Sequence, residues 1–489
     1  MLTLFIAATR LLTLEADEAN ILLGAYNVFG IPVPQASAAA YPTVTSGGLF
    51  PLIHGLLGLL TTDIGVHRAV SVVVVVVFVV ATFWLLREMR VSRSLAMAGA
   101  AMSAATPGLL LVGSLAMAEV MATLLLLFGT LLWVRAGRRS AAGAVLAGLL
   151  FGMACATRFN AIFIFPALLI YALDFETGWR RKLLYPGLAT VTGVFLLLAA
   201  TQLYYLAAGT EAAGNIGTLT GASMGKDIFS FARYLLIAND WLPLWVIAAI
   251  AGTYVAAGRY VLRRRDRQLT ALLLLAGGFG WLMWIFKAPI PHVRYLWPAM
   301  PCLWLGAIIV ATTLIERARN QSARTAYHIS ALVACFYQVL TGSYIMSQGD
   351  SLVMAYKLNR TSAFVDKVPS WTAAADQKAL AGVVQKLPSS AELYTINRNS
   401  AFPITYLSGR AVATLEGASF TDKPAYLLAL PVDYALWRPT NEILSWRERN
   451  AIEIWRRGDF VLYRIRPHAP TPPLQRQMIG ANDIYPSRP

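Results

Sequence analysis

Long hydrophobic runs alternate with short polar segments along the chain up to residue 346. Residues 71–86 (SVVVVVVFVVATFWLL) and 191–208 contain no charged side chain, and runs of this length approach the ~20 residues that a helix needs to cross a ~30 Å hydrocarbon layer. Buried helices of a soluble protein would not come in such numbers. The pattern therefore predicts a mainly α-helical, polytopic membrane bundle with about eleven transmembrane helices. The predicted spans cover approximately residues 1–14, 66–86, 94–112, 116–134, 141–157, 159–173, 183–207, 239–258, 269–286, 294–315 and 325–346.

Three of these spans are unusual. Residues 1–14 reach only ~21 Å as a helix, so this span either continues into the following segment or begins upstream of Met1. Acidic residues rather than a small-residue cleavage site follow it, so we interpret it as a membrane span and not as a cleavable signal peptide. Residues 141–157 and 159–173 are separated only by Arg158, so they form either two spans or one bent or re-entrant unit.

The composition becomes that of a soluble domain after residue 346. Segments that favour strands alternate there with helical stretches, which predicts a small α/β domain. The strand-like segments are 391–396, 404–407, 411–415, 425–430 and 459–465, and the helical stretches are 373–386 and 442–455. The predicted domains are a transmembrane domain over 1–346, an α/β domain over 347–466 and a proline-rich tail over 467–489.

The segment after the first span, residues 15–65, is expected to form an outer loop. Its stretch 19–29 is amphipathic and its stretch 49–60 is apolar, so we expect two short helices that lie at the outer membrane interface. The Pro and Gly residues between them predict an irregular crossing.

Composition and charge agree with a membrane protein. Of the 489 residues 57% are hydrophobic and 13% are charged, against about a quarter charged in ordinary soluble domains. The net charge of +16 would suit nucleic acid, but the basic residues cluster in short loops on one side of the predicted bundle. This positive-inside pattern predicts a multi-pass protein of the plasma (inner) membrane, with these loops in the cytoplasm and the C-terminal domain on the extracytoplasmic side. The basic loop residues are Arg87, Arg90, Arg93, Arg135, Arg138, Arg139, Arg180, Arg181, Lys182, Arg259, Arg263, Arg264, Arg265, Arg267, Arg317, Arg319 and Arg324.

Carboxylates are scarce on the predicted extracytoplasmic side, which shortens the search for chemistry. Asp17 and Glu18 lie where the first span emerges. They either mark the end of that helix or lie at the membrane boundary with a raised pKa, suited to bind a metal or to accept a proton. Glu119 lies near the outer end of an apolar span, where ionisable side chains are usually partnered and functional. Its alternative interpretation is a structural ion pair, for which Arg158 is the candidate partner.

Three basic side chains gather at an outer boundary, where cations are otherwise rare. Lys287, His292 and Arg294 fall within the segment KAPIPHVRYLWPAMP. They either bind an anion such as a lipid-linked phosphate, for which Arg offers a bidentate fork and Lys a point charge, or extend into ordinary lipid headgroups.

Other patterns narrow the chemistry further. The sequence contains no Walker loop, no G-x-G-x-x-G ahead of a helix, no H-E-x-x-H and no Cys/His zinc spacing, which disfavours nucleotide-driven and zinc chemistry. We interpret His54 as a packed histidine. Asp63 and Arg68 are expected to pair at the start of a helix.

Four segments together resemble the GT-C class of membrane glycosyltransferases, in particular the protein-mannosyltransferase and aminoarabinose-transferase-like families. They are LEADEANILLGAYNVFGIPVP (14–34), GGLFPLIHGLLGLLTTDIGVHRAVS (47–71), TRFNAIFIFPALLIY (157–171) and VRYLWPAMPCLWL (293–305). The first has an acidic pair after a span, the second an apolar stretch ahead of an Arg, the third an Arg before a Pro-containing span, and the fourth an Arg-Tyr followed by two prolines. The second departs from many relatives because it has no adjacent proline pair.

The resemblance implies transfer of a sugar from a polyprenyl-phosphate donor to a hydroxyl group of a glycan, lipid or protein acceptor, with inversion at the anomeric carbon. Asp17 would be the catalytic carboxylate, Glu18 its companion and Glu119 a second acidic member of the site. The residues implied to bind the donor phosphate are Arg294, Lys287, Arg158 and His292. Some relatives use a divalent metal, Mg or Mn, and Asp17 and Glu18 would then be its ligands.

Three other functions are compatible with parts of the pattern. A secondary transporter would explain Glu119 and Arg158 inside the membrane, but it predicts inverted repeats, and the sequence shows no convincing internal repeat. A polymerase or ligase of lipid-linked glycans would use the same class of donor. A non-catalytic membrane scaffold would need no site.

Overall fold

The computed structural model of the chain describes residues 6, 9–10, 12–14, 16–33, 48–104, 109–207, 268–287, 299–318, 320–348, 373–396, 398–415, 418–430 and 441–473. The chain folds into two compact units. The helical unit comprises Met1–Thr9, Val44–Ile53 and Thr61–Ser343, and the mixed unit comprises Arg10–Thr43, His54–Leu60 and Tyr344–Pro489. The outer loop expected over 15–65 is therefore divided between the two units. The boundaries expected near residues 346 and 466 stay predictions.

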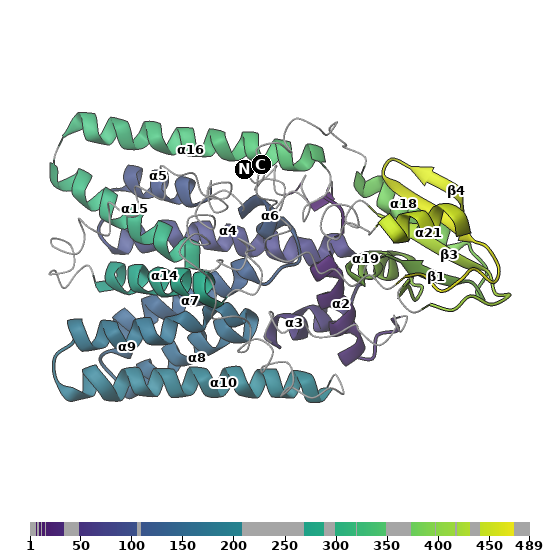
Figure 1. Cartoon of the computed structure of the whole chain (residues 1–489). Coiled ribbons are helices and arrows are strands. Elements are labelled where there is room, and N and C mark those ends of the chain that lie inside the picture. Colours follow the sequence, from purple (N-terminus) through teal and green to yellow (C-terminus); the bar gives the residue numbers. More distant parts are fainter. Residues whose placement is uncertain are drawn as a thin grey trace. The chain divides into compact units, whose positions relative to one another are not determined.

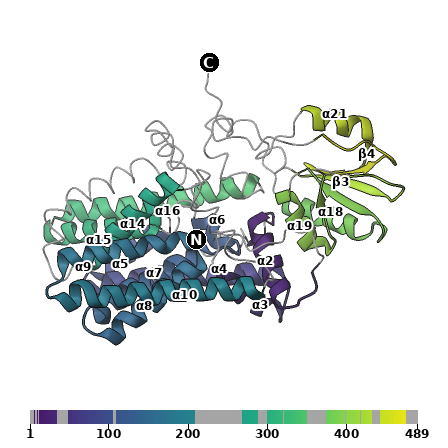
Figure 2. The same ribbon diagram turned by 60° about the horizontal axis from the view of Figure 1, so that its bottom comes forward.

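The helical unit is a bundle of α-helices (Figures 1 and 2). Its helices are α4 (Ile64–Glu88), α5 (Arg93–Ala104), α6 (Leu109–Ser114), α7 (Glu119–Leu132), α8 (Ala141–Thr157), α9 (Ile164–Phe175), α10 (Tyr185–Ala207), α14 (Gln268–Lys287), α15 (Ala299–Ala318) and most of α16 (Gln321–Gln348). Single π-helical turns form at η1 (Trp133–Gly137) and η3 (Arg180–Leu184), and a 3₁₀ turn forms at η2 (Phe159–Phe163). The expectation of a mainly α-helical fold is confirmed.

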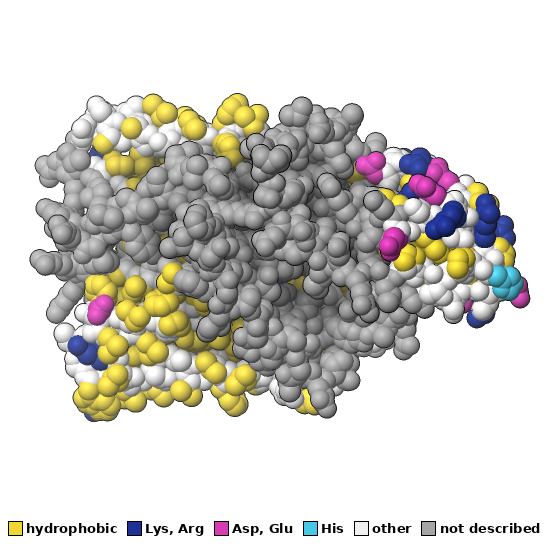
Figure 3. Space-filling view, viewed as in Figure 1, with side chains coloured by type: hydrophobic (Ala, Val, Ile, Leu, Met, Phe, Trp, Pro, Cys, Tyr) yellow, Lys and Arg dark blue, Asp and Glu magenta, His cyan; other side chains and the backbone are white. Residues whose placement is uncertain are grey.

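Among the described residues, three helices are long and apolar enough to cross a membrane, namely Ile64–Glu88, Glu119–Gly137 and Arg180–Tyr204. Shorter apolar helices are Leu49–Gly58, Ala141–Thr157, Phe159–Phe175, Thr270–Met283 and Ala299–Thr312. Large hydrophobic side chains are exposed on several of these helices, including Val80 and Trp84 of α4 and Val191 and Phe195 of α10. Figure 3 shows hydrophobic side chains gathered over α16 and over α9 and α10, as expected of a surface that meets lipid. The described residues do not confirm the expected count of about eleven spans.

Two helices begin where their capping residues predict. Asp63 accepts a hydrogen bond from the backbone N–H of Gly65 at 2.8 Å and starts α4. Ser140 accepts one from the backbone N–H of Gly143 at 3.1 Å and starts α8. Both are favourable N-cap residues because a side-chain oxygen satisfies an N–H that has no partner within the helix.

The close contact between α8 and α10 depends on glycine. A Cβ atom added at Gly148 would lie 2.4 Å from the backbone oxygen of Ala189, and one added at Gly152 would lie 2.6 Å from that of Gly193. Small residues allow the backbones of two membrane helices to approach in this way. The pair α8 and α10 is therefore a fixed element of the bundle.

The mixed unit contains a five-stranded sheet with the order β2-β1-β3-β5-β4. Its strands are β1 (Glu392–Thr395), β2 (Ala413–Thr414), β3 (Ala425–Ala429), β4 (Ala451–Arg457) and β5 (Phe460–Ile465), and its helices include α2 (Ala16–Val28), α18 (Ala373–Gln385), α19 (Arg398–Ser408) and α21 (Asn441–Asn450). β1 pairs in parallel with β2 and β3, whereas β5 pairs antiparallel with β3 and β4. Side chains alternate between two apolar clusters: Leu428 and Leu462 belong to one, Leu427 and Ile465 to the other.

Two assignments within this α/β domain are wrong. Residues 404–407, expected as a strand, lie in α19, where Ile404 and Thr405 are fully buried. Their β-branched side chains favour strands locally, but the packing of α19 against α2 and α18 prevails. The helix expected over 442–455 ends at Asn450, because Ala451–Arg457 pairs instead with β5 as strand β4.

Both helices expected in the outer loop are present, as α2 and α3 (Leu49–Gly58). The side chains from Glu18 to Tyr26 are all buried. An interfacial helix needs one polar, exposed face, so the expectation of an amphipathic surface helix is wrong for α2.

Candidate functional site

The structure brings two of the predicted site residues together inside the helical unit. The Nη2 atom of Arg158 lies 3.1 Å from the Oε1 atom of Glu119. Glu119 is 1% exposed and Arg158 is 3% exposed. The ion pair weighed in the sequence as the alternative interpretation of Glu119 is confirmed, and it places opposite charges in an apolar interior.

Arg158 lies at a break between two helices. α8 ends at Thr157, and Arg158 itself is extended, with φ −143° and ψ 111°. Its backbone N–H donates to the oxygen of Ala154 at 2.9 Å, and its carbonyl accepts from the N–H of Ala161 at 2.9 Å. Because both backbone groups are satisfied, the chain can leave the helix at this point without leaving a buried polar backbone group unpaired.

Glu119 is the first residue of α7, so its side chain lies at the N-terminal end of an apolar helix. The hydroxyl of Thr123 donates to the backbone oxygen of Glu119 at 2.9 Å. Within the described part of the chain, neither carboxylate oxygen of Glu119 accepts a hydrogen bond of good geometry. A helix N-terminus favours a negative charge. Within that part of the chain, the carboxylate nevertheless has fewer hydrogen bonds than a buried carboxylate normally makes.

The energetics of this pair favour a role beyond stability. Removing two charges from water costs several kcal/mol for each ion, and the attraction between them offsets this only when the geometry is excellent and hydrogen bonds satisfy the remaining atoms. The Glu119–Arg158 pair lacks those further hydrogen bonds to its carboxylate within the described residues. Ionisable side chains at such positions in membrane helices are candidates for a function, and the role of this pair in a reaction stays a prediction.

The acidic pair of the first outer loop lies on α2 of the mixed unit. Asp17 and Glu18 are the second and third residues of this helix. Glu18 is 0% exposed, and the side chain of Asp17 is outside the described residues. The role of this pair in catalysis stays a prediction.

The structure describes only some of the cationic residues that are predicted to bind the donor phosphate. Lys287 is the last residue of α14, but its side chain is not described. His292 and Arg294 lie outside the described residues. Of the predicted donor-binding residues, Arg158 is thus the one whose surroundings the structure describes.

The structure also describes three residues that the sequence analysis weighed as minor. His54 of α3 is fully buried, which agrees with a packed histidine. Asp63 caps α4, whereas Arg68 donates from Nη1 to the backbone oxygen of Thr9 at 2.9 Å. These contacts are those of structural residues.

A complete metal site is not found in the described part of the chain. No three His, Cys, Asp or Glu side chains described there lie close enough to hold an ion. Glu18 offers one buried carboxylate, which alone is too few ligands for Mg²⁺ or Mn²⁺. The predicted use of a divalent metal by Asp17 and Glu18 stays a prediction.

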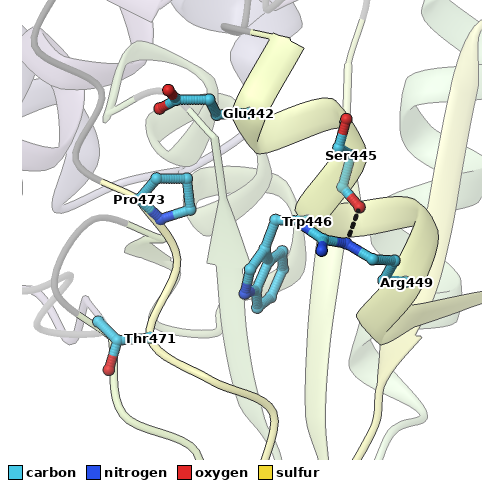
Figure 4. Close-up of a pocket in the computed structure, with 6 residues that line it drawn as sticks. All are labelled: Glu442, Ser445, Trp446, Arg449, Thr471 and Pro473. Carbon is cyan, nitrogen blue, oxygen red and sulfur yellow. Dashed lines mark hydrogen bonds between the residues drawn. The ribbon is translucent and has the colours of Figure 1, made fainter.

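The mixed unit contains a cavity of about 530 Å³ beside α21 (Figure 4). Glu442, Ser445, Trp446, Arg449, Thr471 and Pro473 line it. The indole N–H of Trp446 donates to the backbone oxygen of Pro470 at 2.7 Å, and Nε of Arg449 donates to that of Ser445 at 3.1 Å. Of the predicted catalytic residues whose side chains the structure describes, Glu18 and Glu119, neither lines this cavity.

One family of known proteins matches part of the chain. Residues 50–205, which include both members of the pair, match the dolichyl-phosphate-mannose-protein mannosyltransferase family. No curated protein matches the chain by sequence.

Solved structures share the fold over nearly the whole chain. The structure of ArnT from Cupriavidus metallidurans bound to undecaprenyl phosphate matches with a TM-score of 0.55 at 14% identity, over 95% of this chain and 96% of that chain. The apo state of the same protein gives 0.54 at 14% identity, with the same coverage. The archaeal oligosaccharyltransferase AglB from Archaeoglobus fulgidus, in complex with an inhibitory peptide and a dolichol-phosphate, gives 0.53 at 12% identity, over 94% of this chain and 73% of that chain.

The chain therefore shares its fold with membrane proteins of known structure, and part of its helical unit matches a mannosyltransferase family. Both findings support the resemblance of the four sequence segments to the GT-C class. The family match over residues 50–205 supports a glycosyltransferase-type membrane enzyme.

Proposed function

We propose that this protein transfers a sugar from a polyprenyl-phosphate donor to a hydroxyl group of an acceptor on the extracytoplasmic side of the plasma membrane, with inversion at the anomeric carbon. The observation that carries the proposal is the match along 95% of the chain to a protein whose structure holds undecaprenyl phosphate. The dolichol-phosphate in the AglB structure supports the same class of ligand.

In the proposed reaction, the acceptor oxygen attacks the anomeric carbon while the bond from that carbon to the phosphate oxygen breaks. Asp17 accepts the hydroxyl proton, with Glu18 as its companion. The polyprenyl phosphate leaves with the bonding electrons. The negative charge that develops on it is stabilised by cations, for which we propose Arg294, Lys287, His292 and Arg158.

We assign Glu119 the task of holding Arg158. The carboxylate at 3.1 Å keeps the guanidinium in a dry location, where a fixed charge acts on a reacting group more strongly than it would in water. Arg158 is thus available at fixed geometry when the phosphate leaves, without the reorganisation that water would need.

A donor assay tests this proposal. Purified protein is incubated with a panel of polyprenyl-phosphate sugars, and the consumption of each is followed by mass spectrometry. Loss of one donor from the panel in the presence of an acceptor extract supports the proposal, and release of free polyprenyl phosphate identifies the leaving group. If every donor survived while lipid-linked oligosaccharides were lengthened or transferred, the protein would be a glycan polymerase or ligase.

A further inference from the structure

The segment that leads into helix α2, which carries the acidic pair, is bound to the α/β domain by the side-chain amide of Gln377. We call this pair of hydrogen bonds the amide clasp. Gln377 of α18 accepts a hydrogen bond at Oε1 from the backbone N–H of Leu14 at 2.8 Å. The Nε2 atom of the same side chain donates to the backbone oxygen of Leu14 at 3.1 Å. Gln377 is 4% exposed and Leu14 is 5% exposed, so this contact is buried and connects residues far apart in the sequence.

A second polar contact lies further along α2. The hydroxyls of Tyr26 and Tyr406 are 3.1 Å apart, and their rings are tilted at 30° with centroids 5.9 Å apart. Tyr406 belongs to α19, which packs against α2 (Figures 1 and 2). The α/β domain therefore contacts both the approach to α2 and its C-terminal half.

The C-terminal end of α2 also lies close to two glycines of α3. A Cβ atom added at Gly58 would lie 2.4 Å from the ring of Tyr26, and one added at Gly55 would lie 2.2 Å from the ring of Phe29. Tyr26 of α2 and Phe29, which directly follows α2, thus lie against α3 with no room for a larger residue at Gly55 or Gly58.

We propose that Gln377, assisted by Tyr406, is a positioning residue for the acidic pair Asp17 and Glu18. Through these contacts the C-terminal α/β domain fixes the position and the orientation of α2. The inference rests on the proposed function, because it assigns Asp17 and Glu18 a catalytic task.

The physical reason is the short distance along the chain between the clasp and the acids. Leu14 precedes Asp17 by three residues, and an amide side chain that bonds both backbone groups of one residue fixes its position and its orientation. Misplacing a catalytic group by about 1 Å can cost about a hundredfold in rate. The buried backbone groups of Leu14 would also have to find other partners if the amide were removed.

The test is Gln377→Leu in the full-length protein in detergent or nanodiscs. We expect kcat to fall by about tenfold or more with donor KM changed by no more than about twofold, because the donor phosphate is bound by other residues. Backbone hydrogen–deuterium exchange in peptides that contain Leu14 should become faster. Tyr406→Phe, which removes only one hydroxyl, should lower kcat less and in the same direction.

The matched control is Gln385→Leu. Gln385 lies on the same helix, is exposed, and donates to the backbone oxygen of Leu407 at 3.4 Å, so its loss should leave kcat and exchange at Leu14 unchanged. The proposal is overturned if Gln377→Leu turns over like Gln385→Leu, or if kcat, donor KM and melting temperature all change together. A wild-type protein that transfers no sugar would contradict the proposed function instead, while exchange at Leu14 would still report on the clasp.

Discussion

Single residues show how far chemistry can be inferred from sequence spacing. Glu119 and Arg158 were singled out because charges are rare in apolar segments, and the structure joins them at 3.1 Å. Gln377 was missed, because a glutamine in a soluble helix carries no signal of its own and its partner is the backbone of Leu14, 363 positions away. Every residue type except proline offers the same backbone N–H and C=O groups, so a long-range contact to the backbone produces no recognisable pattern in the sequence.

The charge pair yields a prediction that separates structure from function. Glu119→Gln should destabilise the protein by about 3–5 kcal/mol, because it removes the negative charge that lies 3.1 Å from the buried guanidinium of Arg158. The double variant Glu119→Gln, Arg158→Gln should recover most of that stability, since both charges are gone, but not the transfer activity. Thermal unfolding in detergent and turnover measure the two effects separately. Recovery of both in the double variant would show that the pair is structural only.

The acidic pair yields a second prediction. Asp17→Asn should abolish transfer while the protein still inserts and folds, because the amide keeps the shape of the side chain but cannot accept the proton. Glu15→Gln is the comparison and should have a mild effect. Turnover is measured at matched protein levels in membranes, and near-normal turnover of Asp17→Asn would shift the catalytic role to Glu18 or Glu119.

The proposed contact between Arg294 and the donor phosphate yields a third prediction. Arg294→Ala should cost roughly 2–4 kcal/mol of transition-state stabilisation with every acceptor, and Arg294→Lys less, because Lys keeps the charge but loses the fork. The values of kcat/KM for the donor measure both variants. Unchanged donor kinetics together with a lower melting temperature would make Arg294 a structural residue.

At the scale of elements, the apolar runs predict helices reliably, and the short strand-like segments are less informative. α4 and α8 begin beside Asp63 and Ser140 as local rules require. Residues 404–407 became part of a helix because α19 packs against α2 and α18. Where the outcome depends on which distant helix supplies the packing surface, a local preference cannot decide it.

The contact between α8 and α10 is testable with a pair of glycines. Gly148→Ala should cost about 1–3 kcal/mol, because its Cβ would meet a backbone oxygen that cannot move aside. A Cβ at Gly187, near the start of α10, would meet nothing within 4 Å, so Gly187→Ala should be neutral or stabilise the helix by up to about 1 kcal/mol. Thermal melting of the two variants compares them. Equal stabilities would contradict the close packing of the two helices.

At the scale of the whole molecule, the membrane character was predictable because it follows from composition and from the order of apolar and polar segments. The resemblance to the GT-C class came from four particular sequence segments and not from composition. The number of spans and the division of the outer loop between two units were not predictable, since they depend on contacts between segments far apart in the chain. The sidedness of the protein rests on the positions of its basic loops. It decides on which face of the membrane the proposed chemistry takes place.

The most direct test of the central claim is a coupled assay on the purified protein with its preferred polyprenyl-phosphate sugar and a hydroxyl acceptor. We predict that each sugar transferred releases one molecule of free polyprenyl phosphate and that the new glycosidic bond has the inverted anomeric configuration, as read by NMR. Asp17→Asn should release none. The account would be contradicted by retention of configuration, by release of polyprenyl phosphate without any glycosylated product, or by full activity of the Asp17 variant.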